Sequence, residues 1–141
     1  MIQPNDETLL EATIVFKVDL QNASRKIQVS GSTFFDQLAV AILAAFEFDN
    51  DHLYEFEYKN RYGYSERVVH PQVEDDAPIT TEWLVGSASP YPGMTFVFIF
   101  DFGYYWEFLL TVDSIDNKPC NPKPKIIEKH GKPPKQYSYD E

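Results

Sequence analysis

Thr95-Phe-Val-Phe-Ile-Phe-Asp-Phe-Gly-Tyr-Tyr-Trp-Glu-Phe108 decides the fold of this 141-residue chain, because eight of these fourteen residues are aromatic. Residues 94–100 are apolar on both faces, as in a strand at the centre of a sheet. Gly103 permits the positive φ angle that a tight reversal needs, and residues 105–113 then return antiparallel. The stretch predicts a central aromatic hairpin over residues 94–113.

Further strands are predicted on both sides of this hairpin in the sequence. Apolar residues alternate with polar ones from Ala12 to Leu20, which is the period of a half-buried strand, and residues 25–29 form a short returning strand. Tyr54 to Tyr58 alternates aromatic residues with glutamates, which predicts another half-exposed strand.

One long amphipathic helix is predicted over about residues 33–47, packed on the sheet. Thr33 and Asp36 have the spacing of a capping box at its start. Its apolar residues recur three and four positions apart and form one continuous stripe. They are Phe35, Leu38, Ala39, Ile42, Leu43 and Phe46.

The chain has the length of a single α+β domain with a mainly antiparallel sheet. Residues 1–8 are polar and are expected to be frayed, and residues 12–117 are expected to form the globular body. Five prolines follow within the first seventeen residues of the segment that starts at Lys118. Residues 118–141 are therefore expected to be an irregular, extended tail packed on the body.

Charge is unevenly distributed along the chain, whose formal net charge is −10. Residues 1–117 contain 6 Lys and Arg against 19 Asp and Glu, whereas residues 118–141 contain 6 Lys against 3 acidic residues. The acidic body repels phosphate groups, so nucleic acid is a poor partner for it. The Lys-rich tail is expected to lie against the acidic body, and a contact of the tail with nucleic acid is the alternative.

The single cysteine and the short apolar runs predict a protein of the cytoplasm. Cys120 has no second thiol for a disulfide or a cysteine-rich zinc site. Residues 1–11 contain three acidic side chains, which argues against a secretory signal. The longest apolar run, residues 38–46, is far shorter than the about 20 residues that cross a membrane, so no membrane partner is expected.

Five polar residues form the candidate site: Asp49, Asp51, His52, Asp101 and Glu107. Carboxylates and an imidazole can bind divalent metals, but the sixth position counted from Asp49 is not the glycine of a calcium loop. Caps on free backbone groups are the preferred explanation of the loop at residues 49–52, so no metal site and no cofactor are predicted. One interpretation of Asp101 and Glu107 is acid–base chemistry. The other is that the Asp101 carboxylate accepts hydrogen bonds from the amides of the turn and that Glu107 faces outward.

Three aromatic residues at the turn of the hairpin are candidates for contact with a partner. They are Phe102, Tyr104 and Tyr105. Tyrosine is enriched among the residues that dominate binding energy at interfaces. The competing interpretation is that these rings line the core at the tip of the hairpin.

Three blocks of sequence resemble a known family. They are Thr33-Phe-Phe-Asp36 continuing to Ala44-Ala-Phe-Glu-Phe-Asp-Asn-Asp-His-Leu-Tyr-Glu-Phe56, then Phe100-Asp-Phe-Gly-Tyr-Tyr-Trp-Glu107, and the tail segments Pro122-Lys-Pro-Lys and Gly131-Lys-Pro-Pro134. With these blocks the chain resembles the plasmid pRiA4b ORF-3-like family from about Ala12 to Tyr137. The resemblance implies an α+β domain with a mainly antiparallel sheet and one long helix. It also implies an association with plasmids and insertion elements, and no activity is established for the family.

The chain departs from the family pattern at its polar positions. Tyr104 stands where the family tends to have Asp, and Phe108 stands where the family has His. Cys120 is alone in a tail that often contains several cysteines in the family. A metal or acid–base site shared by the family would therefore lack several of its ligands in this chain.

The leading functional hypothesis is an uncharacterised, mobile-element-associated protein that acts as a non-enzymatic binding or interaction module for a protein partner. The aromatic hairpin, the acidic surface and the lack of a catalytic motif support it. The alternative is a metal-dependent hydrolase or nucleic-acid-processing enzyme with its site at the 49–52 loop and the 101–107 turn.

Overall fold

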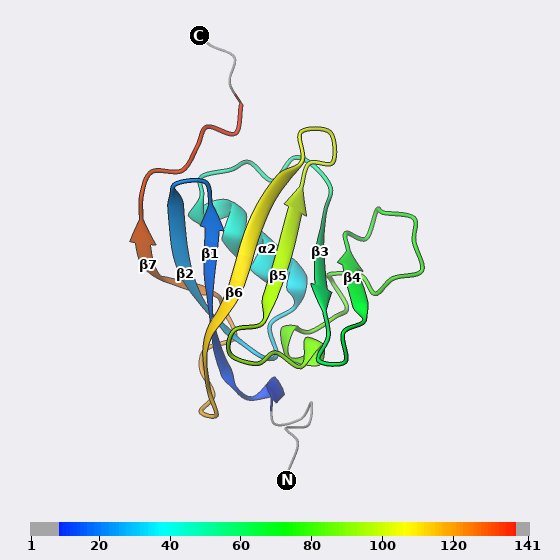
Figure 1. Ribbon diagram of the computed structural model, residues 1–141, viewed down its shortest axis with the longest axis vertical. Helices are drawn as coiled ribbons and strands as arrows, with labels where there is room; N and C mark the ends of the chain where they lie inside the picture. The colour runs from blue at the N-terminus through cyan, green and yellow to red at the C-terminus, as the bar shows by residue number, and fades with distance from the viewer. Residues whose placement is uncertain (1–8, 138–141) are drawn as a thin grey trace.

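The computed structural model describes residues 9–137, which form a seven-stranded sheet in the order β4-β3-β5-β6-β1-β2-β7 (Figure 1). All neighbouring strands pair antiparallel. The elements are β1 (Thr13–Leu20), β2 (Ala23–Ser30), α2 (Phe35–Ala45), β3 (Tyr54–Lys59), β4 (Ser65–Val69), the 3-10 helix η1 (Val85–Ala88), β5 (Thr95–Phe100), β6 (Trp106–Asp116) and β7 (Lys125–His130). The expected frayed residues 1–8 lie outside the described residues.

The aromatic stretch forms β5 and β6, the third and fourth strands of the sheet. Its turn differs from the expectation, because Asp101 (φ 65°) and Tyr105 (φ 67°) adopt positive φ angles and Gly103 does not. The Asp101 carboxylate accepts hydrogen bonds from the backbone N–H groups of Gly103 and Tyr104, at 3.1 and 3.2 Å. The Asp101 side chain thus stabilises the turn, as one of its two interpretations expected, and the turn does not depend on a positive φ angle at Gly103.

The predicted long amphipathic helix over residues 33–47 is wrong, because α2 has 11 residues. Phe34 has an extended backbone at the start of α2, and the Gln37 side chain accepts the Phe34 N–H at 2.9 Å. The Thr33 hydroxyl donates instead to the carbonyl of Pro122 and accepts from the N–H of Ser30. Thr33 is therefore held by the tail and by β2, and the helix starts after it.

The helix also ends earlier than its apolar pattern indicated. Glu47 has a left-handed backbone (φ 63°), so Phe46 and Phe48 reach the core from a non-helical turn. Within residues 9–137 no helix combines the length and the apolar character that a membrane crossing requires.

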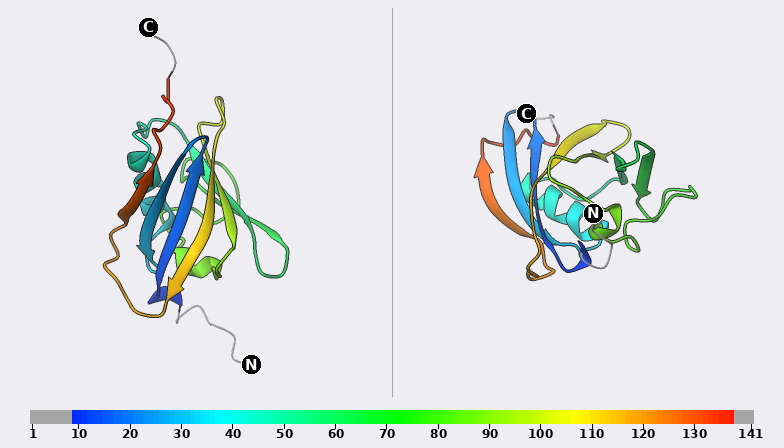
Figure 2. Two further views of the ribbon diagram at one scale, coloured as in Figure 1. Left: turned by 60° about the vertical axis from the view of Figure 1, so that its left-hand side comes forward. Right: turned by 60° about the horizontal axis from the view of Figure 1, so that its bottom comes forward.

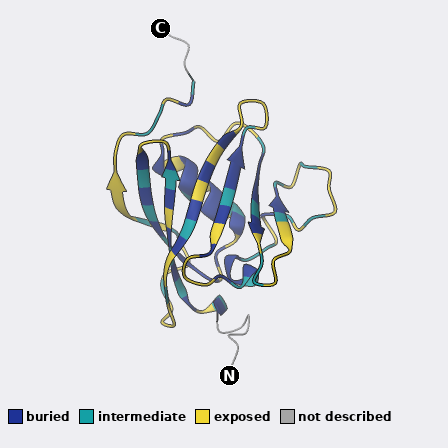
Figure 3. Ribbon diagram, in the orientation of Figure 1, coloured by how far each residue is buried: buried dark blue, intermediate teal, exposed yellow. Residues whose placement is uncertain are grey.

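The core lies between α2 and one face of the sheet, which curves around the helix (Figure 2). The Phe35 ring lies 5.0 Å from Phe56, and the Phe46 ring lies 5.2 Å from Phe108. Buried and exposed residues alternate along β6, as expected for a sheet that packs on one face (Figure 3). Among residues 9–137 no helix covers the opposite face, which we call the outer face of the sheet.

The tail is not irregular throughout, because residues 125–130 form β7 and pair with β2. The tail prolines lie at positions 119–124 and 133–134 and so flank this strand without interrupting it. Six consecutive residues therefore keep the N–H groups that a strand needs. Residues 138–141 lie outside the described part of the chain.

A buried arginine joins β7 to the end of the helix. Arg25 on β2 is 3% exposed, and its guanidinium lies 5.0 Å from the Phe46 ring centroid. Its Nε donates to the carbonyl of Ala45 at 2.9 Å, and its Nη1 donates to the carbonyls of Ser24 and His130 at 2.7 and 3.0 Å. The cation thus satisfies backbone carbonyls at the negative end of α2 and at the end of β7.

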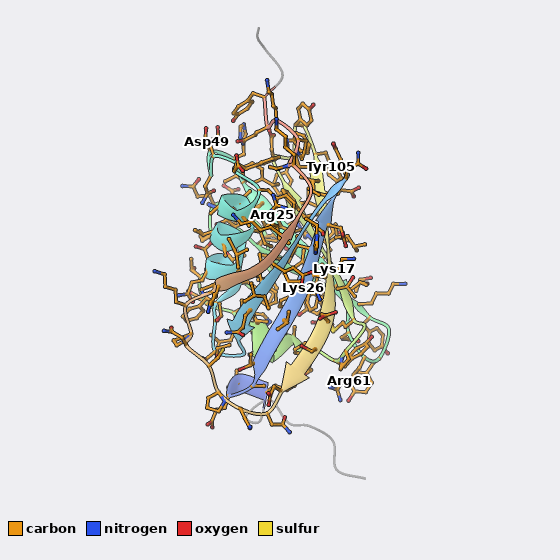
Figure 4. The ribbon with its side chains drawn as sticks, turned by 90° about the vertical axis from the view of Figure 1, so that its left-hand side faces the viewer. Lys17, Arg25, Lys26, Asp49, Arg61 and Tyr105 are labelled. Carbon is orange, nitrogen blue, oxygen red and sulfur yellow. The ribbon has the colours of Figure 1, made fainter. Side chains whose placement is uncertain are left out.

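Replacement of this arginine is expected to destabilise the fold. Arg25→Met keeps the length of the side chain but leaves buried carbonyls without donors, so the free energy of unfolding should fall by about 3 kcal/mol. The adjacent Lys26 is the matched control, because it points away from the helix and its Nζ lies 3.4 Å from the exposed Asp113 carboxylate (Figure 4). Lys26→Met should change the free energy by less than about 1 kcal/mol. Urea unfolding measures both, and equal losses would contradict the role of Arg25.

Candidate functional site

Three of the predicted polar residues lie together at one end of the sheet. His52 Nδ1 lies 2.9 Å from Asp51 Oδ1, and His52 Nε2 lies 3.6 Å from Asp101 Oδ2. The histidine therefore lies between two carboxylates, one from the loop before β3 and one from the β5–β6 turn. All three side chains lie at the end of the sheet where β3 begins and β5 ends, and the Asp51 and His52 side chains are exposed.

The other two predicted polar residues lie elsewhere. Asp49 is exposed, and its backbone is bound by the tail. Glu107 is on β6, opposite Ile99, and projects from the outer face of the sheet. Within residues 9–137 no group of three or more His, Cys, Asp or Glu side chains is arranged to hold a metal ion.

The tail closes over the loop that carries Asp51. The Gln136 side chain accepts the Asp49 N–H at 2.6 Å and donates to the Asp49 carbonyl at 3.0 Å and to Asp51 Oδ1 at 3.1 Å. The hydroxyl of Tyr137 donates to Asp51 Oδ2. This hydrogen bond, with a further contribution from His52, lowers the pKa of the Asp51 carboxyl. The polar cluster is thus tied to the tail.

A second group of polar residues lies on the outer face and borders a pocket of about 520 Å³. The pocket spans the three strands β4, β3 and β5 at the end of the sheet opposite to His52. Its lining residues are Glu57, Tyr58, Lys59, Ser65, Glu66, Arg67, Tyr91, Thr95 and Val97. The lining combines charged, hydroxyl and apolar groups, as ligand sites commonly do.

Arg67 organises the charges beside this pocket. Its Nη2 and Nε donate to the two carboxylate oxygens of Glu55 at 2.7 and 3.2 Å, and its Nη1 donates to Asp75 Oδ2 at 2.6 Å. These carboxylates raise the pKa of Arg67, Glu55 contributing more than Asp75. Burial opposes the ionisation of Glu55, but hydrogen bonds from Arg67 and Glu57 outweigh it and lower the pKa of Glu55.

Glu57 is a lining carboxyl whose pKa is raised well above its ordinary value. Its hydrogen bond to the ionised Glu55, then its partial burial and the negative charges of Glu55 and Glu107 raise its pKa to about 7. Arg67 acts in the opposite direction but is already paired. The two glutamates of β3 thus share one proton, with Glu55 ionised and Glu57 as the donor.

The predicted interaction residues Phe102, Tyr104 and Tyr105 are all exposed, so the interpretation that they line the core is wrong. Tyr104 stacks on Trp106, with ring centroids 4.7 Å apart and 12° between the ring planes. Partial desolvation of its exposed hydroxyl, followed by the negative charges of Glu57 and Glu107, raises the pKa of Tyr105. Tyr105 therefore borders the acidic part of the outer face.

Residues 10–137 match the family model described as plasmid pRiA4b ORF-3-like protein, which spans most of the chain. The chain belongs to the plasmid pRiA4b ORF-3-like family. The family match agrees with the resemblance found in the sequence. No curated protein sequence matches the chain significantly.

A solved structure has the same fold as this member of the pRiA4b ORF-3-like family. The crystal structure of a protein of unknown function, MM3350 from Methanosarcina mazei Go1, superimposes with a TM-score of 0.69. The two chains share 22% sequence identity, over 85% of this chain and 70% of the other. At this identity the likeness concerns the fold.

The sequence of this family member does not predict the pocket, because the alternation of residues along β3 is also that of an ordinary half-exposed strand. Glu55 and Glu57 alternate with three aromatic residues, which by itself indicates one buried and one exposed face. The informative signal is the pair of like charges two residues apart on one strand face, which need a cation between or beside them. The register that places Arg67 opposite Glu57 supplies that cation, and it is set by the β3–β4 pairing.

Removal of Gln136 is expected to free the tail from the polar loop. Gln136→Ala deletes three hydrogen bonds to residues 49 and 51 and should increase local opening about tenfold. Trypsin then cleaves faster after Lys135, whereas Lys132 is protected by the proline that follows it. Mass spectrometry of timed digests measures this rate. Gln72→Ala, in an exposed loop, is the control, and an unchanged rate in Gln136→Ala would show that the tail is held by other contacts.

The shared proton predicts a pH-dependent stability difference between the wild type and Glu57→Gln. The folded pKa of about 7 exceeds the ordinary value of 4.5. Protonation of Glu57 therefore stabilises the fold at low pH, and this contribution is lost as the pH rises through about 7. Glutamine donates to Glu55 at every pH, so the variant should gain about 1 kcal/mol on the wild type between about pH 5 and about pH 8.

Denaturant unfolding at several pH values measures this difference. Glu82→Gln, an exposed glutamate outside the pocket lining, is the matched control and should keep a constant difference from the wild type. A parallel pH dependence of the wild type and Glu57→Gln would disprove the shared proton.

Proposed function

We propose that this chain is a non-enzymatic binding module whose ligand surface is the outer face of the sheet at the Glu57 pocket. One observation carries the proposal. Helix α2 and the aromatic core cover one face of the sheet, while the other face keeps a pocket of about 520 Å³ between β4, β3 and β5. The surface lies on paired strands, which hold a binding site more rigidly than loops do.

Exposed tyrosines at the end of the pocket support a protein or peptide ligand. Tyr91 lines the pocket, and the β3–β4 turn that adjoins it carries Tyr62 and Tyr64, which are 74% and 71% exposed. The Arg61 Nη2 donates to the carbonyl of Ser89 at 3.4 Å, which holds this turn beside the segment that carries Tyr91. Exposed tyrosines provide large contact areas at a low entropic cost of ordering.

The predicted interaction residues belong to the opposite end of the same face. Arg61 and Tyr105 lie at opposite ends of the molecule in Figure 4, and the acidic side chains of β3 lie between these ends. An extended peptide that follows β3 and β5 would contact the tyrosines at one end and Tyr105 at the other. This length favours a segment of a protein partner over a small molecule.

The polar cluster at His52 gives less support to an enzymatic function. His52 and its two carboxylate neighbours contact each other, and Asp51 is also bound by the tail residues Gln136 and Tyr137. The cluster thus has its hydrogen-bonding groups engaged with the chain itself. We interpret it as a contact that orders the tail.

Peptide selection with a blocked pocket tests the proposal. A random peptide library displayed on phage is selected against the immobilised full chain, and the selected peptides are labelled and titrated against the wild type and Thr95→Trp. Thr95 is exposed and lines the pocket, so tryptophan fills the space without a change of charge. We expect Thr95→Trp to weaken binding by at least about 10-fold.

The matched control lies on the neighbouring strand. Thr111 pairs with Thr95 across β5 and β6 and does not line the pocket, so Thr111→Trp should change affinity less than about threefold. A library that yields no binder, binders that Thr95→Trp does not affect, or chemical conversion of the bound peptide would each contradict the proposed function.

A further inference from the structure

We propose that the Glu57 pocket receives a lysine or arginine side chain of an extended peptide, with the Glu57 carboxylate as its acceptor. This inference rests on the binding function proposed above and adds the chemical class of the ligand. It is carried by the arrangement of the charged groups around the pocket, by the rim of tyrosines and by the position of Glu57 in the lining.

One of the two lining cations that an acidic ligand could use, Arg67, is already paired. Arg67 directs its Nε, Nη1 and Nη2 atoms at the carboxylates of Glu55 and Asp75, with distances between 2.6 and 3.2 Å. An anionic ligand that binds Arg67 would have to displace one of these carboxylates, and if it displaced Glu55, that carboxylate would be left buried without its cation. Such an exchange is strongly unfavourable, so the arrangement disfavours an anion at Arg67.

The balance of charge around Glu57 favours a cation instead. The charged groups that face Glu57 are the carboxylates of Glu55 and Glu107 and the guanidinium of Arg67, and the Asp75 carboxylate acts on Glu55 through the same arginine. Lys59 lines the pocket on the same face, two residues further along β3. Glu66 also lines the pocket, so five carboxyl groups stand against two cations, and the raised pKa of Glu57 reduces this imbalance.

A bound ammonium or guanidinium would replace that proton. The Glu57 proton would leave to solvent, the carboxylate would pair with the ligand cation, and Glu55 would keep its two hydrogen bonds from Arg67. The site thus exchanges one positive charge for another without disturbing the buried ion pair.

The apolar part of the lining suits the stem of such a side chain. Val97 lies opposite Glu57 in the β3–β5 pairing and forms the floor beside it, and Tyr91 lines the same pocket. Lysine and arginine bury an aliphatic stem along apolar surface and stack a cation on aromatic rings. The exposed Tyr62 and Tyr64 at the adjoining turn offer the same contact to flanking residues of the peptide.

Titration with a defined cation tests the inference by nuclear magnetic resonance. N-acetyl-arginine amide is added to the isotope-labelled full chain, with N-acetyl-citrulline amide as its neutral isostere and N-acetyl-glutamate amide as the anion. We expect saturable shifts at Glu57, Lys59, Thr95 and Val97 with the arginine compound, and binding at least about 10-fold weaker with citrulline. The titration midpoint of the Glu57 carboxyl carbon should fall to lower pH at saturation.

Two variants separate recognition from structure. Glu57→Gln should weaken the arginine compound about 10-fold and remove its preference over citrulline, whereas Glu107→Gln, on the same face outside the lining, should keep that preference. No site-specific shifts, equal binding of citrulline, or a preference for glutamate would overturn the inference. The proposed function would still stand if Thr95→Trp weakens the selected peptides, and it would fall separately if that variant has no effect.

Discussion

The packing of aromatic rings between α2 and one face of the sheet is the interaction on which the rest of the structure depends. Phe35 and Phe46, at the two ends of the helical segment, contact Phe56 on β3 and Phe108 on β6. Each such pair contributes about 0.5–1.5 kcal/mol beyond the burial of its area. Because all of these rings point toward the helix, the aromatic residues of the central strands are committed to one face. The outer face carries the charged side chains together with the aliphatic residues Val97, Ile99 and Leu109.

This asymmetry explains the chemistry of the outer face. Glu55 and Glu57 must both leave the core side of β3, because the aromatic residues between and beside them occupy it. A strand brings residues two apart to the same face, so the two carboxyls meet. Arg67, opposite Glu57 on β4, lowers the pKa of Glu55, and the pKa of Glu57 is raised beside it. The unusual acid of the pocket therefore follows from the way the core is packed.

The parts of the fold that follow from local patterns could be predicted, and those that depend on distant contacts could not. The alternation in residues 12–20 and the aromatic stretch predict their strands because each pattern is complete within the strand itself. The start of α2 depends on the bond from Thr33 to Pro122, 89 residues away, and β7 depends on its pairing with β2. The alternative hypothesis of an enzyme required the 49–52 loop to lie close to the 101–107 turn, and His52 does lie close to Asp101. The pocket could not be predicted in this way, because it depends on the register between β3 and β4.

A strand designed only for stability would not keep Glu57. A threonine or valine at this position would suit a half-exposed β3 and would remove the repulsion that keeps the carboxyl protonated. Glu55 would lose its hydrogen bond from Glu57 but would keep its two hydrogen bonds from Arg67. Local rules of sheet design are thus broken at one residue, and that residue lines the pocket of the uncovered face. Departures from local consistency concentrate where a protein binds a ligand, because a group left incompletely paired in the free protein can be paired by the ligand. By this argument the raised pKa of Glu57 agrees with the proposed site, which a cation from outside the chain would complete.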